Sequence, residues 1–238
     1  MTVIGHLEQH PGLNPPPFQA TIESIGEDWV ILDKSYFYPI GGGQPSDKGQ
    51  ITSNSFSCDI VDVRNRETYI HSFQNIRGTV NVGDIVNCEV DAIWRNQMCK
   101  MHTAQHIISA LASEEWGAQT VGNQIGYDRT RIDLLFENRE LFDKDHLESY
   151  INDEIQKGHT VSMDFRSTED LLSDPLVRID LSRMPKHIET FRTISIGQID
   201  VCPCAGTHVE DTSQIPDIEI TKVKSKGSGK LRIEYVMK

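Results

Sequence analysis

Residues 91–117 read DAIWRNQMCKMHTAQHIISALASEEWG, and they separate two parts of the chain that differ in their sequence patterns. Asp91 is a residue type that caps helix N-termini, and Gly117 is one that ends helices. Apolar residues at helical spacing lie between them: Ile93, Met101, Ile108, Leu111 and Ala112. The sequence therefore predicts one long helix over this stretch.

The segment before this helix, residues 18–90, has the pattern of short strands. Apolar runs such as WVILD (29–33) and YIHSF (69–73) are separated by Gly, Asn and Asp. Strands at this spacing, with turn residues between them, are typical of a small β-barrel or β-sandwich. The prolines of PGLNPPP (11–17) predict a stiff, extended lead-in rather than a helix.

The segment after the long helix mixes a second helix with strands. This helix is predicted over residues 143–157, and its apolar face is formed by Leu147, Tyr150, Ile151 and Ile155. Strand-like runs cover residues 131–136, 160–165, 191–196 and 218–223. Such a mixture predicts the α+β class. We expect a β-rich N-terminal domain over residues 1–90 and an α+β domain over residues 91–238.

Composition limits the class of protein. The chain has 238 residues, of which 37% are hydrophobic and 24% charged, as in soluble globular proteins. We find no basic start followed by an apolar run, and no apolar stretch approaches the ~18 residues of a membrane span. A cytoplasmic location without membrane contact is therefore expected. The net charge of −12 argues against a protein that coats DNA.

The cysteines indicate a reducing compartment. There are five of them, an odd number, in a chain without a visible export signal, so free or metal-bound thiols are expected rather than disulfides. Cys58, Cys88 and Cys99 have no ligand-spaced neighbours and are predicted to be small buried hydrophobic residues.

Two separated motifs together supply a candidate metal site. In HTAQH (102–106), His102 and His106 lie one helical turn apart and can reach a single ion. In CPCAGTH (202–208), Cys204 and His208 complete a set of three imidazoles and one thiolate. No Glu follows His102, which excludes the zincin protease motif. Cys202 points away from Cys204 in an extended chain and is left out of the set. Spacing alone leaves a metal site and a chance coincidence about equally open.

Residues 35–49, SYFYPIGGGQPSDKG, form a glycine-rich loop. Its consecutive glycines are Gly41, Gly42 and Gly43. They permit close approach of a ligand, and their N–H groups can form an anion nest. The absence of GKS or GKT excludes a nucleotide P-loop. A flexible turn between strands is the commoner use of such a run, but Gln44 and Asp47, which follow directly, favour a recognition loop.

Together, SYFYPIGGGQPSDKG, HTAQH, CAGTHV and the closing ITKVKSKGSGKLRIEYV (220–236) resemble the free-standing alanyl-tRNA editing proteins of the AlaX family. These are relatives of the editing domain of alanyl-tRNA synthetase. The resemblance covers about residue 18 to the C-terminus. It implies a small β-barrel-like N-terminal domain packed on a zinc-binding α+β editing domain. The implied activity is hydrolysis of the ester in mischarged tRNA(Ala), chiefly seryl-tRNA(Ala) and in some members glycyl-tRNA(Ala).

The resemblance also implies roles for particular residues. One zinc ion per chain would be held by His102, His106, Cys204 and His208. Gln44 would lie in the pocket wall, with the three glycines and Asp47 beside the substrate. We expect the amide of Gln44 and the hydroxyl of Ser35 to read the serine side chain or to orient water. Because three histidines and a cysteine fill four positions, as in structural sites, we expect zinc to position the substrate.

Two positions depart from the family pattern. Ser35 stands where the family commonly has Thr, so the hydroxyl is kept but a methyl worth about 1 kcal/mol in an apolar pocket is lost. Ala205 stands where CGGTH is usual, and it is tolerated unless the backbone there needs a positive φ.

The C-terminal segment is locally basic in an otherwise acidic chain. Its cationic residues are Lys222, Lys224, Lys226, Lys230 and Arg232. This pattern indicates either a phosphate-binding stripe or an edge strand protected by lysines. The resemblance favours the acceptor end of tRNA(Ala) as the partner. We expect neither DNA nor a membrane as a partner, and a monomer or weak homodimer.

Three other functions remain open at this point. A zinc-stabilised RNA-binding module without catalysis needs the same ligands and basic tail, but not Gln44 or Ser35. A small-molecule metallohydrolase needs no tRNA and responds little to salt. The editing domains of threonyl-tRNA synthetases share the ligand pattern but explain GGGQPSD less well.

Overall fold

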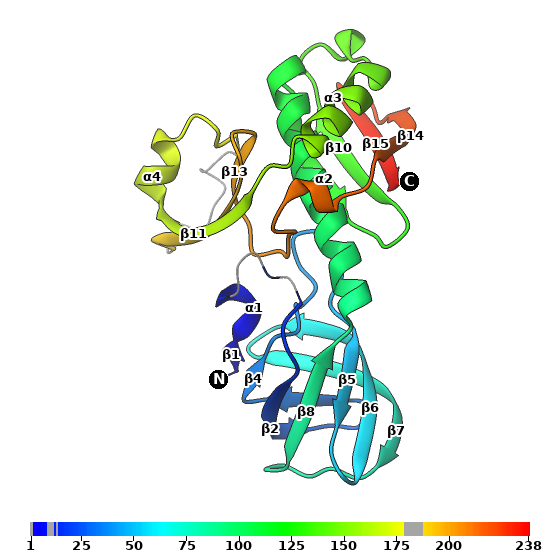
Figure 1. The fold of residues 1–238 in the computed structure, drawn as a ribbon, viewed down its shortest axis with the longest axis vertical. Coiled ribbons are helices and arrows are strands. Elements are labelled where there is room, and N and C mark those ends of the chain that lie inside the picture. Colours follow the sequence, from blue (N-terminus) through cyan, green and yellow to red (C-terminus); the bar gives the residue numbers. More distant parts are fainter. Residues whose placement is uncertain (1, 9–11, 13, 179–187) are drawn as a thin grey trace.

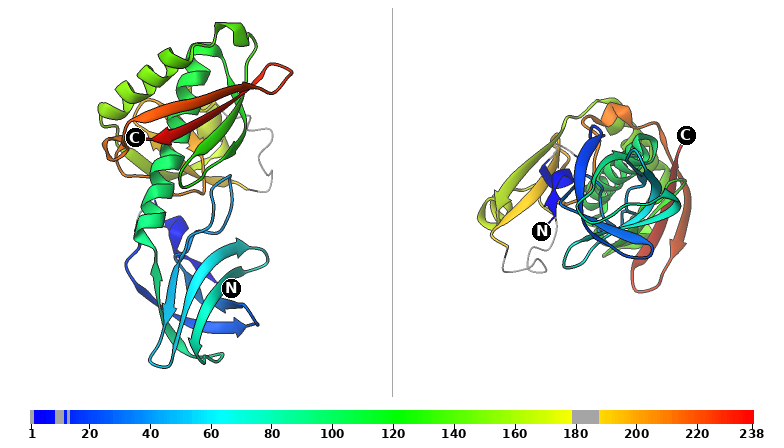
Figure 2. Two further views of the ribbon diagram at one scale, coloured as in Figure 1. Left: turned by 90° about the vertical axis from the view of Figure 1, so that its right-hand side faces the viewer. Right: turned by 90° about the horizontal axis from the view of Figure 1, so that it is seen from below.

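The computed structural model describes residues 2–8, 12, 14–178 and 188–238 and has a mixed α+β architecture (Figure 1). A β-barrel forms one end of the molecule, and a long helix leads from it into a second region of helices and sheets (Figure 2). The extended lead-in expected over residues 11–17 lies partly outside the described residues. Residues 14–17 carry no helix or strand.

Within residues 18–90, six antiparallel strands close into a barrel, which decides between the expected barrel and sandwich. In barrel order they are β2 (Phe18–Ile25), β3 (Trp29–Leu32), β7 (Tyr69–Gly78), β6 (Phe56–Asn65), β5 (Gly49–Thr52) and β8 (Ile85–Val90). Alternate residues point inward, as the twofold repeat of a strand requires. Ile22, Leu32 and Val86 are fully buried in this interior.

A short N-terminal segment packs beside the barrel. β1 (Val3–Ile4) pairs in parallel with β4 (Lys34–Ser35), and α1 (Gly5–Glu8) follows directly. The segment therefore covers the chain just before the glycine-rich loop.

The long helix predicted from the sequence is α2 (Ala92–Trp116). The carboxylate of Asp91 accepts the N–H groups of Ile93 and Trp94, and Gly117 ends the helix with a left-handed φ of 63°. The expected apolar stripe is buried except at Ile93, which is 75% exposed. Including Ile93 was wrong, because its side chain lies on the solvent side of the first turn, whereas the neighbouring Trp94 packs against the second core.

Two sheets build the second region. The first has the order β14 (Ile218–Ser225), β15 (Lys230–Met237), β10 (Thr130–Leu135) and β9 (Gln119–Gln124). The second has the order β11 (Val161–Ser167), β12 (Thr190–Ile196) and β13 (Asp200–Pro203). All neighbouring strands in both sheets are antiparallel. The remaining elements are α3 (Lys144–Gln156), α4 (Thr168–Ser173) and 3₁₀ turns at Arg139–Leu141 and Thr212–Gln214.

The second helix also agrees with its prediction. Asp143 caps α3, and Leu147, Ile151 and Ile155 are buried in a cluster with α2 and the first sheet. A separate apolar cluster fills the barrel. The division into independently folding domains at residue 90 stays a prediction.

The expectations for the cysteines are met. All five cysteines have free thiols, and Cys58, Cys88 and Cys99 are buried among apolar side chains. In the part of the chain that the structure describes, no helix has the length and apolar composition needed to cross a membrane.

Candidate metal centre and its cavity

Four side chains far apart in sequence converge at one point beside α2. The ligand atoms of His102, His106, Cys204 and His208 all lie within 4.8 Å of one another. The Cys204 Sγ atom is 3.7 Å from His102 Nε2 and 3.4 Å from His208 Nε2. A tetrahedral zinc ion with bonds of ~2.0–2.3 Å holds such atoms about 3.3–3.6 Å apart. The cluster can therefore bind a metal ion with little rearrangement.

An outer layer of acceptors fixes each imidazole. Each Nδ1 atom lies within hydrogen-bond distance of an oxygen outside the cluster: His102 with Gln44 Oε1 (2.7 Å), His106 with Asp200 Oδ2 (2.8 Å) and His208 with Thr103 Oγ1 (3.1 Å). When each Nδ1–H donates outward, each Nε2 lone pair is left for the centre. Such outer partners orient metal-binding histidines and raise their basicity.

The loop that carries Cys204 is held by contacts that the sequence patterns did not reveal. The Arg192 guanidinium donates to the carbonyls of Cys204 (2.6 Å) and Gly206 (3.0 Å). A Cβ atom on Gly206 would lie 2.1 Å from Cε1 of His102, so only glycine fits there. Ala205 is exposed and has no positive φ, so the departure from the family pattern causes no strain.

The electrostatics of the centre suit a metal ion. Burial lowers the pKa values of His102 and His208, which keeps both imidazoles neutral as metal binding requires. Burial alone would raise the pKa of the Cys204 thiol, but the adjacent His102 and His208 bring it well below its ordinary value. His106 differs: burial lowers its pKa, but the hydrogen bonds to Asp200 and Cys204 raise it to about 10. Binding of a metal ion to the cluster would therefore release a proton from His106.

The centre opens onto a cavity of about 890 Å³ between the barrel and the second region. His102, His106 and Cys204 line it on one side. The barrel contributes Tyr38, Gly41, Gly42, Asn65 and Tyr69. α2 and β9 contribute a wall of neutral polar residues, among them Gln105, Ser109, Thr120 and Asn123. A small polar substrate can therefore reach the cluster.

The glycines of the glycine-rich loop form a tight turn that packs against β9. The amides of Gly41 and Gln44 each donate to the other's carbonyl, at 3.1 and 2.8 Å, so neither is available for an anion nest. Gly42 and Gly43 have φ values of 55° and 85°. A Cβ atom on Gly43 would lie 1.8 Å from Oδ1 of Asn123, which explains the glycine there. Gly41 and Gly42 line the cavity, whereas Gly43 does not, and contact of the glycines with substrate stays a prediction.

Gln44 and Asp47 are fully buried behind the cavity wall rather than in it. The Gln44 amide donates to Thr207 Oγ1 (2.9 Å), and its carbonyl accepts from the Thr207 N–H (3.1 Å) and from His102. Asp47 forms an ion pair with Arg95 and accepts the N–H of Tyr38 at 2.6 Å. Direct substrate contact by these two residues is not what the structure shows, because their polar atoms already have partners.

Gln44 is instead a positioning residue for His102, which gives a prediction. Replacing Gln44 with Ala removes the acceptor for Nδ1–H and frees the ring to rotate or change tautomer. We expect metal affinity to fall about 10–100-fold, the usual effect of losing such an outer partner. Competition with a chelator of known affinity measures it.

Gln44→Glu is the matched variant, because a carboxylate keeps an acceptor for His102 and for the Thr207 N–H. We expect it to retain most of the metal affinity. Equal affinities for wild type and Gln44→Ala would contradict the positioning role.

Ser35 does not reach the cavity either. Its hydroxyl lies 2.7 Å from Nε2 of His71, it accepts the N–H of Phe37 at 3.2 Å, and the residue is fully buried. Ser35 therefore lies on the barrel side of the structure, away from the cavity lining, and its contact with the substrate stays a prediction. β4 turns the side chain inward, which a sequence pattern of two residues does not reveal.

His71, the partner of Ser35, predicts acid sensitivity. Burial lowers the pKa of His71 from 6.5 to about 4. Because the folded state disfavours the proton, the stabilisation is complete above pH 6.5 and is lost as pH falls from 6.5 towards 4. Over this window His71 alone should lower the free energy of unfolding by up to about 1.4 kcal/mol per pH unit.

Urea unfolding at pH 7, 6 and 5 measures this slope. His71→Gln should show a smaller fall in the free energy of unfolding than wild type, although it starts from a lower value. An identical slope in both proteins would show that His71 does not control the acid response.

The predicted basic segment forms the β14–β15 hairpin at the edge of the first sheet. Lys222, Lys224 and Lys226 are exposed, whereas Lys230 is partly buried. Arg232 forms a two-pronged ion pair with Asp133, at 2.7 and 2.8 Å, so its charge is already compensated. Lys222 lies 3.6 Å from Glu234. The exposed cationic stripe is therefore smaller than the sequence indicated, and it does not line the cavity.

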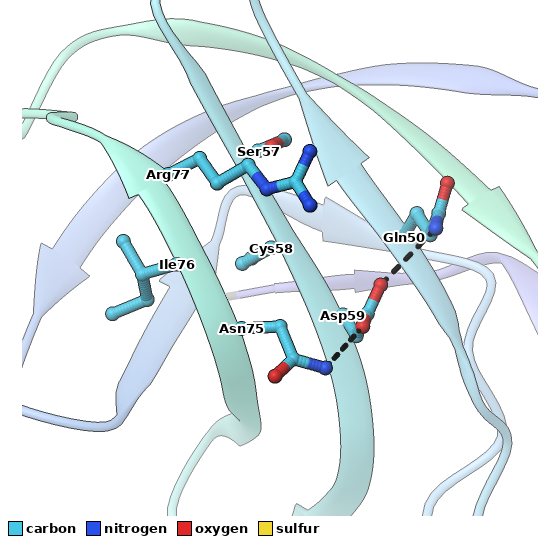
Figure 3. Close-up of a pocket in the computed structure, with 7 residues that line it drawn as sticks. All are labelled: Gln50, Ser57, Cys58, Asp59, Asn75, Ile76 and Arg77. Atoms are coloured by element: carbon cyan, nitrogen blue, oxygen red, sulfur yellow. Dashed lines mark hydrogen bonds between the residues drawn. The ribbon is translucent and has the colours of Figure 1, made fainter.

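A second hollow lies on the outside of the barrel (Figure 3). Its polar centre is Asp59, which accepts hydrogen bonds from Gln50 (3.1 Å) and Asn75 (2.7 Å). None of the site residues predicted from the sequence lines it. The cavity beside the four-residue cluster is therefore the better candidate for chemistry.

Two family models and several known proteins are similar to this chain. Residues 14–94 match the family model of class II (A) tRNA synthetases, and residues 191–234 match that of the threonyl and alanyl tRNA synthetase second additional domain. The alanyl-tRNA editing protein AlaX-M of Methanosarcina barkeri is 32% identical over 92% of this chain and 93% of its own length. AlaX-M of Saccharolobus solfataricus is 31% identical over 93% and 94%. The alanine–tRNA ligase of Halorubrum lacusprofundi is 31% identical over 87% of this chain but only 22% of its own length.

Proposed function

The chain belongs to the family of alanyl-tRNA editing proteins, and from that premise we propose that it hydrolyses the ester of mischarged tRNA(Ala), chiefly seryl-tRNA(Ala). Glycyl-tRNA(Ala) is the second proposed substrate. The observation that carries the proposal is the buried cluster of His102, His106, Cys204 and His208, which opens onto a cavity large enough for an aminoacyl-adenosine end. In this reaction water replaces the ribose oxygen on the carbonyl carbon, and free amino acid and tRNA are released.

Zinc is the proposed metal. Three imidazoles and one thiolate at these separations suit its tetrahedral preference, and the mixture of nitrogen and sulfur donors disfavours magnesium or calcium. When bound, such an ion supplies Lewis acidity towards a carbonyl or a water. Because four protein ligands resemble a closed site, we favour a role in positioning the substrate.

The chain's own residues would hold the substrate around this centre. Gln44, Asp200 and Thr103 keep the three imidazoles in place from behind the cavity wall. In the wall, Gln105 donates to Ser109 (2.8 Å), which also lies 2.8 Å from the hydroxyl of Thr120. These neutral groups can hydrogen-bond ribose and amino-acid hydroxyls without adding charge near the ester.

The exposed lysines of the β14–β15 hairpin are the proposed contact with the tRNA backbone. Lys222, Lys224 and Lys226 carry positive charge on an otherwise acidic chain. Contacts of this kind depend strongly on salt and recognise shape rather than sequence. We propose the acceptor end of tRNA(Ala) as the partner at this surface.

The experiment that tests the function is deacylation of seryl-, glycyl- and alanyl-tRNA(Ala) by the purified protein, with bound metal quantified. We expect rapid loss of the seryl ester while the alanyl ester is spared. Absence of hydrolysis of all three esters by metal-loaded protein that still binds tRNA would reject the enzyme. It would leave a metal-stabilised RNA-binding module in its place.

A further inference from the structure

The lining of the cavity contains few charged side chains. Among the described residues that line it, Arg178 is the only lysine or arginine and Asp200 is the only acid. The rest of the lining consists of the cluster residues and of apolar or neutral polar groups. A negatively charged part of a ligand that enters the cavity therefore has one guanidinium to pair with, and this guanidinium already shares its charge with Asp200.

Arg178 is held at the edge of the cavity by two contacts. It lies on the turn after α4, and its guanidinium pairs with Oδ1 of Asp200 and donates to the carbonyl of Ile199 at 3.3 Å. The Arg178 side chain is 23% exposed, whereas that of Asp200 is 3% exposed. A guanidinium has more N–H donors than these two contacts use. It is thus fixed in direction and still has donors to offer.

Arg178 is also connected to the metal centre. Asp200 uses Oδ1 for Arg178 and Oδ2 for His106, at 2.8 Å. The guanidinium therefore lies one carboxylate and one imidazole away from the point where the four ligand atoms converge. In an aminoacylated terminal nucleotide, the phosphate lies one ribose away from the ester. The cluster and Arg178 line the same cavity, so an ester held beside the cluster would bring the phosphate into the cavity that Arg178 lines.

We propose that Arg178 binds the phosphate of the terminal nucleotide of the substrate, an inference that rests on the proposed deacylase function. A planar guanidinium matches a phosphate with two parallel hydrogen bonds. A phosphate that enters a cavity is costly unless it is paired. The neutral wall of Gln105, Ser109 and Thr120 can hold a ribose or a base but cannot neutralise that charge. The lysines of the β14–β15 hairpin do not line the cavity.

The first test compares adenosine 5′-monophosphate with adenosine, which lacks the phosphate. Binding to wild type, Arg178→Gln and Arg178→Lys is measured by calorimetry on protein of known metal content. We expect Arg178→Gln to lose about tenfold or more in affinity for the monophosphate, the range for a hydrogen bond to a charged group. Its affinity for adenosine should not change. The affinity of Arg178→Lys for the monophosphate should lie between those of wild type and Arg178→Gln, because lysine keeps the positive charge but cannot form two parallel hydrogen bonds.

The second test uses seryl-tRNA(Ala). Arg178→Gln should raise KM while kcat changes little. The logarithm of kcat/KM should also fall less steeply with the logarithm of salt concentration, with a slope smaller by about 0.7 for one lost phosphate contact on a single strand. A residue with only a structural role would not change the salt slope.

Controls separate the phosphate contact from damage to the metal site. Arg178→Gln leaves the carboxylate of Asp200 without its cationic partner, whereas Arg178→Lys retains a cation there. Asp200→Asn is the matched variant: it should weaken metal binding through His106 without a selective loss of the monophosphate over adenosine.

Two results would overturn the proposal. The first is that wild type binds the monophosphate no more tightly than adenosine. The other is a preference that Arg178→Gln and Arg178→Lys share unchanged with wild type. If wild type does not hydrolyse any aminoacyl ester, the deacylase function fails, but the comparison of these two ligands still decides whether Arg178 binds phosphate.

Discussion

Cys204→Ala is expected to lower deacylation of seryl-tRNA(Ala) by more than about 100-fold and to weaken metal binding by at least as much. The thiolate is the only sulfur donor in the cluster, with its Sγ atom 3.4 and 3.7 Å from two imidazole nitrogens. Losing an outer partner of a ligand already costs about 10–100-fold, so losing a ligand costs more. The three remaining imidazoles can still hold zinc, but with an open fourth position.

The measurements are metal content after dialysis and the rate of ester loss at saturating metal. Cys202→Ala is the control, because Cys202 is the neighbouring thiol and is not one of the four residues of the cluster. It should retain both properties. If Cys204→Ala, fully loaded with metal, deacylated at the wild-type rate, the cluster would not be the reaction centre. If Cys202→Ala lost the metal instead, the ligand set would be the alternative of His106, Asp200 and Cys202.

Asp47→Ala is expected to lower the free energy of unfolding by about 3–5 kcal/mol, the largest effect on stability that we predict. Asp47 follows the glycine-rich turn, Arg95 lies in the first turns of α2, and both side chains are fully buried. Arg95 also donates to the carbonyls of Gly12 (2.6 Å) and Tyr36 (2.8 Å). Removing the carboxylate takes the negative charge of Asp47 away from a buried guanidinium where the barrel meets the helix.

Urea unfolding at neutral pH measures this effect. Arg64→Ala is the matched control, because Arg64 pairs with Asp62 at 2.5 Å on the surface and its side chain is 57% exposed. We expect a much smaller loss there, because solvent screens an exposed ion pair. The double variant Asp47→Leu/Arg95→Met should recover part of the loss by removing both charges. Equal losses for Asp47→Ala and Arg64→Ala would show that burial does not set the strength of this pair.

Much of the fold could be predicted because its signals are local. An aspartate N-cap and a following glycine set the ends of α2 and α3, and alternating apolar residues mark the barrel strands. A spacing of four places His102 and His106 on one face of a helix. The donor preference of zinc made HTAQH and CAGTH a candidate pair, and the family resemblance favoured this pair over a chance coincidence. The sequence did not decide between a barrel and a sandwich, because apolar and polar residues alternate along the strands of both folds. Closure of a sheet into a barrel depends on which strands become neighbours.

The outer layer of the site could not be predicted. Asp200, Thr103 and Arg192 contact partners up to 105 residues away in sequence. The presence of a carboxylate, hydroxyl or guanidinium in the sequence does not indicate which distant group it will contact. The same reason explains why the positions of Ser35 and Asp47 outside the cavity lining could not be predicted. Both have residue types suited to a substrate contact, but His71 and Arg95 already engage them.

The sequence by itself thus determined the elements, the four candidate ligands and the family, because these depend on residue type and short spacing. Only the tertiary structure decided which polar groups face the cavity and which lie behind its wall. That choice depends on how strands and loops from distant parts of the chain pack together, and on the cost of burying a polar atom without a partner. It is why Gln44 contacts His102, Asp47 pairs with Arg95, and Arg178 lines the cavity.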